Sequence, residues 1–392
     1  MTENERRILT LLSRGRRLSK RDLATKGGMG WATAVKMVAR LEEQGFVAPV
    51  GTAKKNDGAL GKNAYVYDLS SARPRAVGID VAYTDTQLLL TNLKDETLDT
   101  QSLRTPARLG TERFAAFLAE AIGEFLGPTT GDIAGIGIGM PARLIRSDSD
   151  VFAQVAAIVS RSVGMHVIVE NNIRAYTLFK QRRLFSNKDF VMVTIRTGVG
   201  FGIQLGGQLY RGGDGLAGEL GHFTVVPDGD RCRCGKRGCL ETVVNEKVLY
   251  ERYRRDVLRA GRGVSAAAID EAHLVSGLTD LFHRAATGQR VALDVVRAAA
   301  DYLAYALSSL VLLLNIPEIH ISAHFGTAGS LFGDLVSQAM RAYVYPRMPY
   351  RIRYEPIDPQ GFLLGAAMLV LRDYCDYTIA TAWQPRGHSL PP

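Results

Sequence analysis

Hydrophobic residues near the start of the chain follow the spacing of helices. The apolar side chains within residues 8–12 fall on one face of a helix. Residues 19–22, Ser-Lys-Arg-Asp, have the form of a capping box and predict the start of a second helix. A third helix is predicted from residue 31 to 44, with Val35, Val38 and Leu41 on its buried side. We therefore expect the chain to begin with a group of short helices.

A lysine-rich hairpin is predicted to follow the third helix. Residues 46–48 and 65–67 have strand composition. Helices followed by a hairpin predict a winged helix-turn-helix, whose last helix enters the major groove of DNA while the wing contacts phosphates. A helical protein-interaction module with a solvated basic face is the alternative. The predicted DNA contacts are Trp31, Thr33, Lys36 and Arg40 of the third helix and Lys54, Lys55 and Lys62 of the wing.

Beyond the hairpin, strand patterns alternate with helix patterns. Residues 77–81, 87–92 and 135–141 have the apolar runs of buried strands, and this alternation predicts an α/β body. The apolar stretch at 303–316 is too short to span a bilayer, so we expect a core helix and no membrane association. Residues 362–374 are likewise expected to be a core element first and a dimer contact second.

The positive charge of the chain is concentrated at its start. The 392 residues carry a formal net charge of +9 and are 46% hydrophobic, as expected of an ordinary soluble protein with two or three domains. Residues 1–75 hold 15 Lys and Arg against 7 Asp and Glu, a net charge of +8. A basic head on a nearly neutral body predicts that the head binds a polyanion. The first residues lack the apolar stretch of a secretion signal, so we expect a cytoplasmic protein.

One histidine and three cysteines have the spacing of metal ligands. Cys232 and Cys234 are separated by one residue, and Cys239 follows across two glycines. With His222 upstream, this set suits tetrahedral Zn²⁺, and four protein ligands leave no position for a reactive water. We therefore predict a closed, structural zinc site formed by His222, Cys232, Cys234 and Cys239. A disulfide with unrelated thiols fits poorly, because Cys232 and Cys234 are too close in sequence to bridge easily.

Several motifs of the body together resemble one family. They are Val-Ile-Val-Glu-Asn-Asn at 167–172, Thr-Gly-Val-Gly-Phe-Gly at 197–202, Gly-Glu-Leu-Gly-His at 218–222 and the cysteine group ending in Glu241. With these motifs the chain resembles the ROK family (repressors, open reading frames and kinases). The resemblance implies an α/β fold of the actin-like sugar-kinase type, with two lobes of ribonuclease-H-like topology, preceded in the repressors by a winged helix-turn-helix. The expected domains are a DNA-binding domain at 1–70, a linker at 71–75, an N-terminal lobe at 76–185, and a C-terminal lobe at 186–392 with the zinc knuckle and a closing C-terminal helix.

The same resemblance argues against kinase activity. In the family's sugar kinases, an Asp that directly follows an Asn takes the proton from the sugar hydroxyl. This chain has Asn172 there, and an amide does not accept a proton at neutral pH. Asp80 is followed by Val-Ala-Tyr-Thr instead of phosphate-wrapping glycines, and His324 and Phe325 replace glycines near the adenosine. The turn at 197–200 is preserved, but a glycine turn between strands needs no phosphate. We therefore predict that the protein is not an enzyme; an ATP-dependent sugar kinase with a DNA-binding head is the alternative.

The residues that would contact a sugar are better preserved. By resemblance, Asn171, Asn172, Glu219, His222 and Glu241 point at sugar hydroxyls. One ring nitrogen of His222 would bind zinc while the other contacts a hydroxyl. The predicted function is that of a sugar-responsive repressor of transcription, in which sugar binding changes the affinity for operator DNA.

The predicted partners follow from this function. They are double-stranded operator DNA, a sugar effector, and further copies of the chain in a homodimer or homotetramer. The resemblance implies release of DNA on sugar binding as the commoner arrangement. Control of the regulator by a protein partner, with no role for sugar, is an open alternative.

Overall fold

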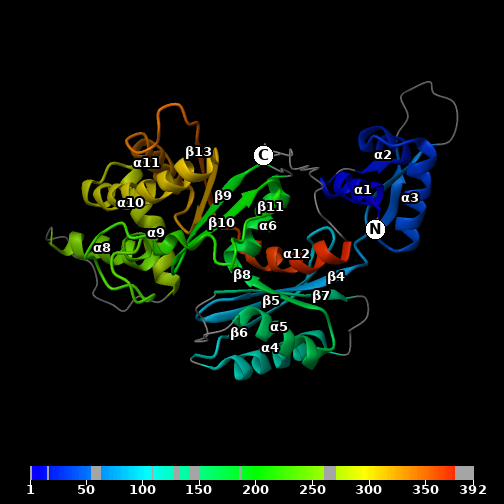
Figure 1. The fold of residues 1–392 in the computed structure, drawn as a ribbon, viewed down its shortest axis with the longest axis horizontal. Coiled ribbons are helices and arrows are strands. Elements are labelled where there is room, and N and C mark those ends of the chain that lie inside the picture. The colour runs from blue at the N-terminus through cyan, green and yellow to red at the C-terminus, as the bar shows by residue number, and fades with distance from the viewer. Residues whose placement is uncertain are drawn as a thin grey trace, which may run out of the picture. The chain divides into compact units, whose positions relative to one another are not determined.

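In the computed structural model, the chain forms two compact units (Figure 1). Unit 1 consists of residues 1–187 and 360–392, and unit 2 consists of residues 188–359. The described residues are 2–15, 17–53, 63–107, 109–127, 133–141, 150–184, 188–259 and 271–375, of which 271–273 and 373–375 are described by their backbone alone.

Unit 1 begins with the elements predicted for the head. Ser19 caps α2: its hydroxyl accepts from the Asp22 amide, and the Asp22 carboxylate accepts from the Ser19 amide, as the predicted capping box requires. The strands of the head pair antiparallel in the order β1-β3-β2. The elements are α1 (Glu3–Ser13), β1 (Leu18–Ser19), α2 (Lys20–Gly27), α3 (Trp31–Glu43), β2 (Val47–Thr52) and β3 (Tyr65–Leu69).

The buried side of α3 differs by one position from the prediction. Ala34, Val38 and Leu41 are fully buried, whereas Val35 is half-buried. Positions spaced by four and three residues form one stripe along a helix, and a neighbouring position lies about 100° away from that stripe. Val35 therefore lies at the margin of the buried face.

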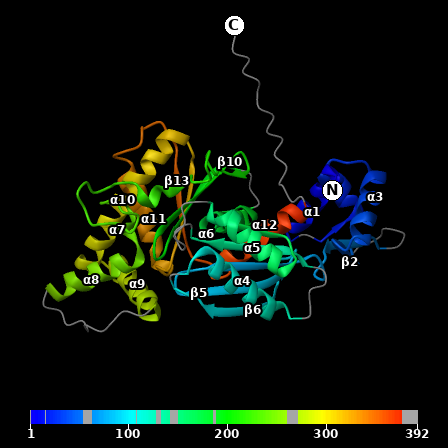
Figure 2. The same cartoon turned by 60° about the horizontal axis from the view of Figure 1, so that its bottom comes forward.

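The rest of unit 1 is a sheet with helices on both faces (Figure 1, Figure 2). Its strands run in the order β6-β5-β4-β7-β8, antiparallel from β6 to β4 and parallel from β4 to β8. Helices α4 and α5 cover one face, and α6 and α12 cover the other. The elements are β4 (Arg75–Val81), β5 (Asp85–Asn92), β6 (Thr97–Arg104), α4 (Thr111–Leu126), β7 (Ile133–Met140), α5 (Val151–Val163), β8 (Val167–Asn171), α6 (Asn172–Leu184) and α12 (Gly361–Cys375).

The C-terminal helix α12 belongs to unit 1 and packs directly on its sheet. A Cβ at Gly78 would lie 2.0 Å from the backbone oxygen of Leu363, and one at Gly137 would lie 1.8 Å from that of Ala366. Only glycine permits this approach of helix to strand. The prediction that residues 186–392 form a single C-terminal lobe is therefore wrong for this helix, because its apolar side chains are buried against the sheet of unit 1.

Unit 2 repeats the strand order of unit 1. Its sheet runs in the order β11-β10-β9-β12-β13, antiparallel from β11 to β9 and parallel from β9 to β13. Helices cover the face that carries Val191, Val193 and Ile321. This repetition is the topology predicted for two ribonuclease-H-like lobes. The elements are β9 (Phe190–Ile195), β10 (Val199–Leu205), β11 (Gln208–Leu209), η1 (Glu219–His222), α7 (Glu241–Val244), α8 (Glu246–Arg259), α9 (Glu271–Ala286), α10 (Arg290–Leu314), β12 (Glu318–Ala323), η2 (Thr327–Gly329), α11 (Ser330–Met340) and β13 (Arg351–Pro356).

Helix α10 is long and apolar enough to cross a membrane, judged by length and composition alone. Yet 61% of its most apolar window is buried inside the protein, and Leu303 and Leu307 are fully buried in the core of unit 2. That burial is typical of a core helix, as predicted for residues 303–316. Near its end the helix turns apolar side chains outward, since Leu313 is 82% exposed.

Candidate metal centre and ligand site

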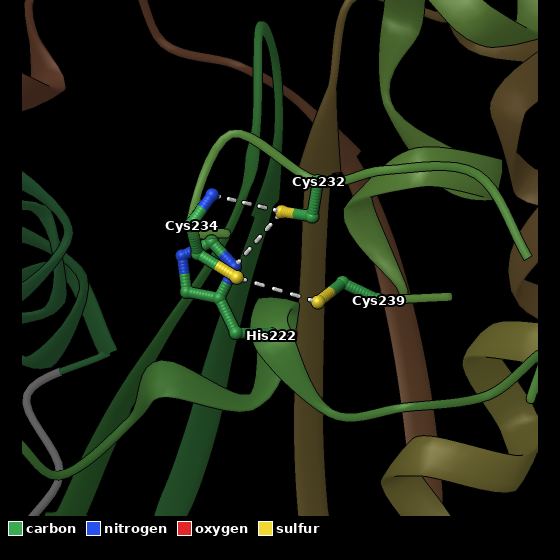
Figure 3. Close-up of side chains that lie close together, drawn as sticks. All are labelled: His222, Cys232, Cys234 and Cys239. Atoms are coloured by element: carbon green, nitrogen blue, oxygen red, sulfur yellow. Dashed lines mark hydrogen bonds between the residues drawn. The ribbon is translucent and has the colours of Figure 1, made fainter. Parts of the chain in front are cut away.

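The structure brings the four predicted metal ligands together in unit 2 (Figure 3). The ligand atoms of His222, Cys232, Cys234 and Cys239 lie within 4.8 Å of one another. The Sγ atoms of Cys234 and Cys239 are 3.6 Å apart. The Sγ atom of Cys232 lies 3.5 Å from Nδ1 of His222. Residues from a 3-10 helix, a loop and the approach to α7 thus converge on one point.

This geometry fits a tetrahedral zinc ion. With Zn–S bonds of about 2.3 Å and a Zn–N bond of about 2.0 Å, tetrahedral ligands stand about 3.8 Å apart from S to S and about 3.5 Å apart from S to N. The observed separations are close to both values, whereas the sulfurs of a disulfide would lie about 2.05 Å apart. Cys232, Cys234 and Cys239 are indeed free thiols. Burial raises the pKa of Cys232 and of Cys239, so a bound cation is what would hold these sulfurs as thiolates.

The knuckle that carries the three cysteines, residues 223–240, is closed by its own backbone. Thr224 pairs with Cys239 as an isolated antiparallel bridge, which brings the end of the knuckle back to its beginning. A Cβ at Gly238 would lie 1.7 Å from the backbone oxygen of Val226. The closure therefore requires glycine next to a metal ligand.

Glu241, a predicted sugar contact, is buried at the start of α7 and held by an arginine of the knuckle. Nε of Arg233 donates to its Oε1 at 3.2 Å, and Nη2 donates to its Oε2 at 3.1 Å. A Cβ at Gly198 would lie 2.5 Å from Nη2 of Arg233, so the guanidinium lies against the turn between β9 and β10. Sequence reasoning missed Arg233. The available signal was its position between Cys232 and Cys234, because the arginine side chain is suited to bidentate pairing with a carboxylate.

The two ring nitrogens of His222 face different groups. Nδ1 lies near Sγ of Cys232 and is 3.6 Å from Oε1 of Glu241. Nε2 lies 3.7 Å from Oε2 of Glu219, whose side chain is 42% exposed. A metal on Nδ1 would place the ring proton on Nε2, where it can be donated to Glu219 or to a ligand hydroxyl.

Asn171 and Asn172 lie in unit 1, at the junction of β8 and α6. Oδ1 of Asn171 accepts from the Ile173 amide at 3.0 Å and so caps the helix. Next to it, the carboxylate of Glu170 and the guanidinium of Arg174 form a buried ion pair at 2.9 Å. This pair was missed, although its spacing of four residues was the available signal. The predicted sugar contacts thus form two groups, one in each unit.

The positions predicted to have lost nucleotide contacts have structural roles in their own units. Phe325 is fully buried and stacks on Phe282 with ring centroids 3.9 Å apart. Nδ1 of His324 lies 3.0 Å from Oε1 of Glu246. Asp80 is buried near the end of β4, ahead of the turn to β5. Phe325 is therefore a core residue of unit 2.

The predicted DNA contacts on α3 differ in exposure. Trp31 is 58% exposed, Lys36 is exposed, and Thr33 is half-buried. Arg40 is also exposed, but its Nε lies 3.4 Å from Oε1 of the buried Glu5, so it pairs with the interior of the head itself. The predicted wing contacts lie outside the described residues: Lys54, Lys55 and Lys62.

The chain is similar to a repressor over nearly its whole length and to a kinase over three quarters of it. A putative xylose repressor from a Caldicellulosiruptor species is 25% identical over 398 residues, covering 94% of this chain and 96% of the relative. A glucokinase from Halalkalibacterium halodurans is 29% identical over 312 residues, covering 75% of this chain and 94% of the relative. The crystal structure of a ROK family transcriptional regulator, a homologue of the E. coli MLC protein, has a TM-score of 0.74 at 21% identity and covers 96% of this chain and 97% of its own.

The family model of the ROK family matches residues 76–373. This span runs from β4 into α12 and contains both sheets and the complete cluster of predicted metal ligands. The chain therefore belongs to the ROK family.

Proposed function

We propose that this protein is a sugar-responsive regulator of transcription, in which the head binds operator DNA and the ROK body binds a sugar. One observation carries the proposal. The likeness to a named repressor covers 94% of this chain, whereas the likeness to a glucokinase covers 75%. The ROK match begins at residue 76, and residues 1–75 carry a net charge of +8. The part that precedes the family match is thus a basic domain suited to DNA.

The head has the elements of a winged helix-turn-helix. Helix α3 follows α2 across a short turn and presents Trp31 and Lys36 to solvent near its start. The hairpin of β2 and β3 is the wing. A pair of such heads in a homodimer, or two pairs in a homotetramer, would bind a pseudo-palindromic operator. Such a regulator would work in the cytoplasm, beside the DNA that it binds, with no role for a membrane.

The ligand we propose is a neutral sugar. In unit 2, Glu219 and Glu241 would supply hydrogen-bond acceptors and Nε2 of His222 a donor. In unit 1, the amides of Asn171 and Asn172 can both donate and accept. Relatives are named for xylose, glucose and N-acetylmannosamine, so D-xylose, D-glucose and N-acetyl-D-mannosamine are the sugars to test first. The zinc ion would have a structural role, holding His222 in place.

We propose further that the protein does not phosphorylate its sugar. The side chain at the position of the family's catalytic base is the amide of Asn172, and loss of a general base lowers a rate by about 10²- to 10⁴-fold. A coupled assay with ATP and the three sugars should show no turnover above background. Turnover that disappears in Asn172→Ala would instead favour the kinase alternative.

The decisive experiment measures DNA affinity with and without sugar. A duplex selected from random sequence by the wild-type protein serves as operator, and its Kd is followed by fluorescence anisotropy. We expect one of the three sugars to weaken binding by about 5- to 150-fold, the range of ordinary allosteric coupling. An unchanged Kd with every sugar, together with calorimetry that detects no sugar binding, would contradict the proposal and favour control by a protein partner.

A further inference from the structure

The turn between β5 and β6, residues 92–96, is fixed by its own side chains. Asn92 is fully buried, and its Oδ1 accepts from the Lys94 amide at 2.9 Å and from the Glu96 amide at 3.3 Å. Its Nδ2 donates to Oε2 of Glu96 at 2.8 Å. One buried amide side chain thus ties the turn into a single shape, so a displacement of one part carries the rest with it.

The same turn holds the DNA-binding head. Nδ2 of Asn92 donates to the backbone oxygen of Ser71, just after the last strand of the head, at 2.9 Å. Nζ of Lys94 pairs with Oδ2 of Asp68, on β3, at 3.1 Å, and both side chains are less than a quarter exposed. Leu93 is buried in the same hydrophobic cluster as Leu69 of β3. Apolar packing, an ion pair and a backbone hydrogen bond therefore join the head to this turn.

Helix α6 holds the turn from its other side. Nε of Arg182, in the last turn of α6, donates to Oδ2 of Asp95 at 2.9 Å, and Nη2 of Arg182 donates to the backbone oxygen of Leu93. The side chains of Arg182 and Asp95 are 12% and 16% exposed. Burial raises the pKa of Asp95, and the neighbouring Arg182 guanidinium opposes that rise. Solvent therefore screens this ion pair less than it would screen an ion pair on the surface.

The first turn of α6 carries the proposed sugar contacts. Asn172 begins the helix and Asn171 caps it, while Arg182 lies near the other end. The helix spans about 18 Å at 1.5 Å per residue, and the residues between its ends are buried almost without exception. A hydrogen-bonded helix moves as a rigid rod, so a shift at Asn172 is a shift at Arg182.

We propose that the turn at residues 92–96 is the joint through which α6 sets the position of the DNA-binding head, with Arg182 as its positioning residue. The inference rests on the proposed function and gives the regulation of that same sugar site. A sugar that hydrogen-bonds Asn171 and Asn172 favours one placement of α6, Arg182 carries the change to Asp95 and Leu93, and the turn carries it to β3. The size of the response is limited by the difference in sugar affinity between the two placements.

The test compares two neighbouring arginines. Arg182→Met removes the guanidinium that contacts the turn, and Arg183→Met removes the same charge from the exposed neighbour, which lies over the ring of Phe179. For each, the Kd of the selected duplex is measured with and without the sugar that acts most strongly on the wild type, and the Kd of that sugar is measured by calorimetry. We expect Arg182→Met to bind the sugar with a Kd within about twofold of that of the wild type. The ratio of its DNA Kd values with and without sugar should be roughly 2- to 30-fold smaller than the wild-type ratio. Arg183→Met should retain the full change.

The outcomes separate this inference from the function beneath it. If the wild type shows no sugar response, the proposed function fails. If the wild type responds and Arg182→Met responds equally, the inference is wrong. Lys94→Met breaks the joint on the side of the head, without touching α6, and provides the same readout if Arg182→Met does not fold. Arg182→Met could instead lower sugar affinity, DNA affinity and stability together while the ratio of DNA affinities with and without sugar stays unchanged. That result would also overturn the inference, because it indicates only a structural role for Arg182.

Discussion

Units 1 and 2 share one strand order but hold their proposed sugar contacts by different means. In unit 1, Asn171 and Asn172 lie where a parallel strand passes into a helix, and a helix cap and a buried ion pair fix them. In unit 2, Glu219, His222 and Glu241 flank a long knuckle with little regular structure. In unit 1, helix and strand hydrogen bonds are sufficient to fix the contacts. In unit 2, the knuckle has few such hydrogen bonds, and we expect a metal ion to cross-link it.

The physical reason is conformational entropy. Ordering the backbone of one residue costs about 1–2 kcal/mol, and a loop without a helix or sheet ladder recovers little of that cost through hydrogen bonds. Binding of structural zinc contributes on the order of 10–16 kcal/mol in small zinc-dependent folds, which would offset a substantial part of the cost of ordering such a loop. A bound metal would therefore stabilise the part of the proposed sugar site that secondary structure leaves unsupported.

Removal of a metal ligand should have the largest effect and should be confined to unit 2. Cys234→Ser should lower the zinc content from about one ion per chain to nearly none and lower the free energy of unfolding by about 4 kcal/mol or more. Elemental analysis and thermal unfolding measure both. Asp228→Asn, an exposed change in the same knuckle, should leave both unchanged. If folded Cys234→Ser fails to bind DNA in the absence of sugar, the effect of the substitution is not confined to unit 2.

Acid should release the metal. Because burial raises the pKa of Cys232 and Cys239, the metal-free protein holds these thiols protonated at neutral pH, whereas the metal-bound form holds thiolates. Zinc binding therefore releases up to three protons, and the apparent affinity should fall as pH falls, by up to roughly a thousandfold per pH unit. Competition with a chromophoric chelator at pH 7 and pH 6 measures the slope. An affinity that does not depend on pH would exclude thiolate ligation.

A change in the head should affect DNA binding alone. Lys36→Ala should weaken operator binding by roughly 3- to 10-fold and reduce the slope of log Kd against log salt by about 1, because one phosphate contact is lost. Lys247→Ala removes the same charge from an exposed helix of unit 2 and serves as the control. An equal effect of both substitutions would mean that only the net charge matters. Zinc content and sugar affinity should stay at the wild-type values in both.

The smallest effect is expected at the arginine that holds Glu241. Arg233→Met removes two hydrogen bonds to the buried carboxylate and should weaken sugar binding by roughly fivefold, about 1 kcal/mol, without loss of zinc. Arg231→Met, two residues earlier and exposed, is the matched control. Calorimetry with the active sugar separates the two variants. Unchanged affinity in Arg233→Met would show that Glu241 keeps its position without the ion pair.

Short sequence signals were sufficient to predict the features that depend on residues close together in the chain. The capping box at Ser19 and the glycine turn between β9 and β10 stand where their residues predicted them. The spacing of Cys232 and Cys234 predicted a cluster that the fold brings together. Strand β6, by contrast, was not predicted, because its residues are mostly exposed and polar and lack a hydrophobic pattern.

Sequence alone predicted most of the element types, the set of candidate metal ligands and the charge division between head and body, because each depends on residue identity and short-range spacing. Tertiary structure decided that α12 returns to unit 1, that Arg233 pairs with Glu241, and that Arg182 reaches the turn holding the head. These contacts join segments whose proximity is set by sheet topology and by glycines that admit a backbone at close range. No local pattern encodes such distances, since they follow from the packing of the whole unit.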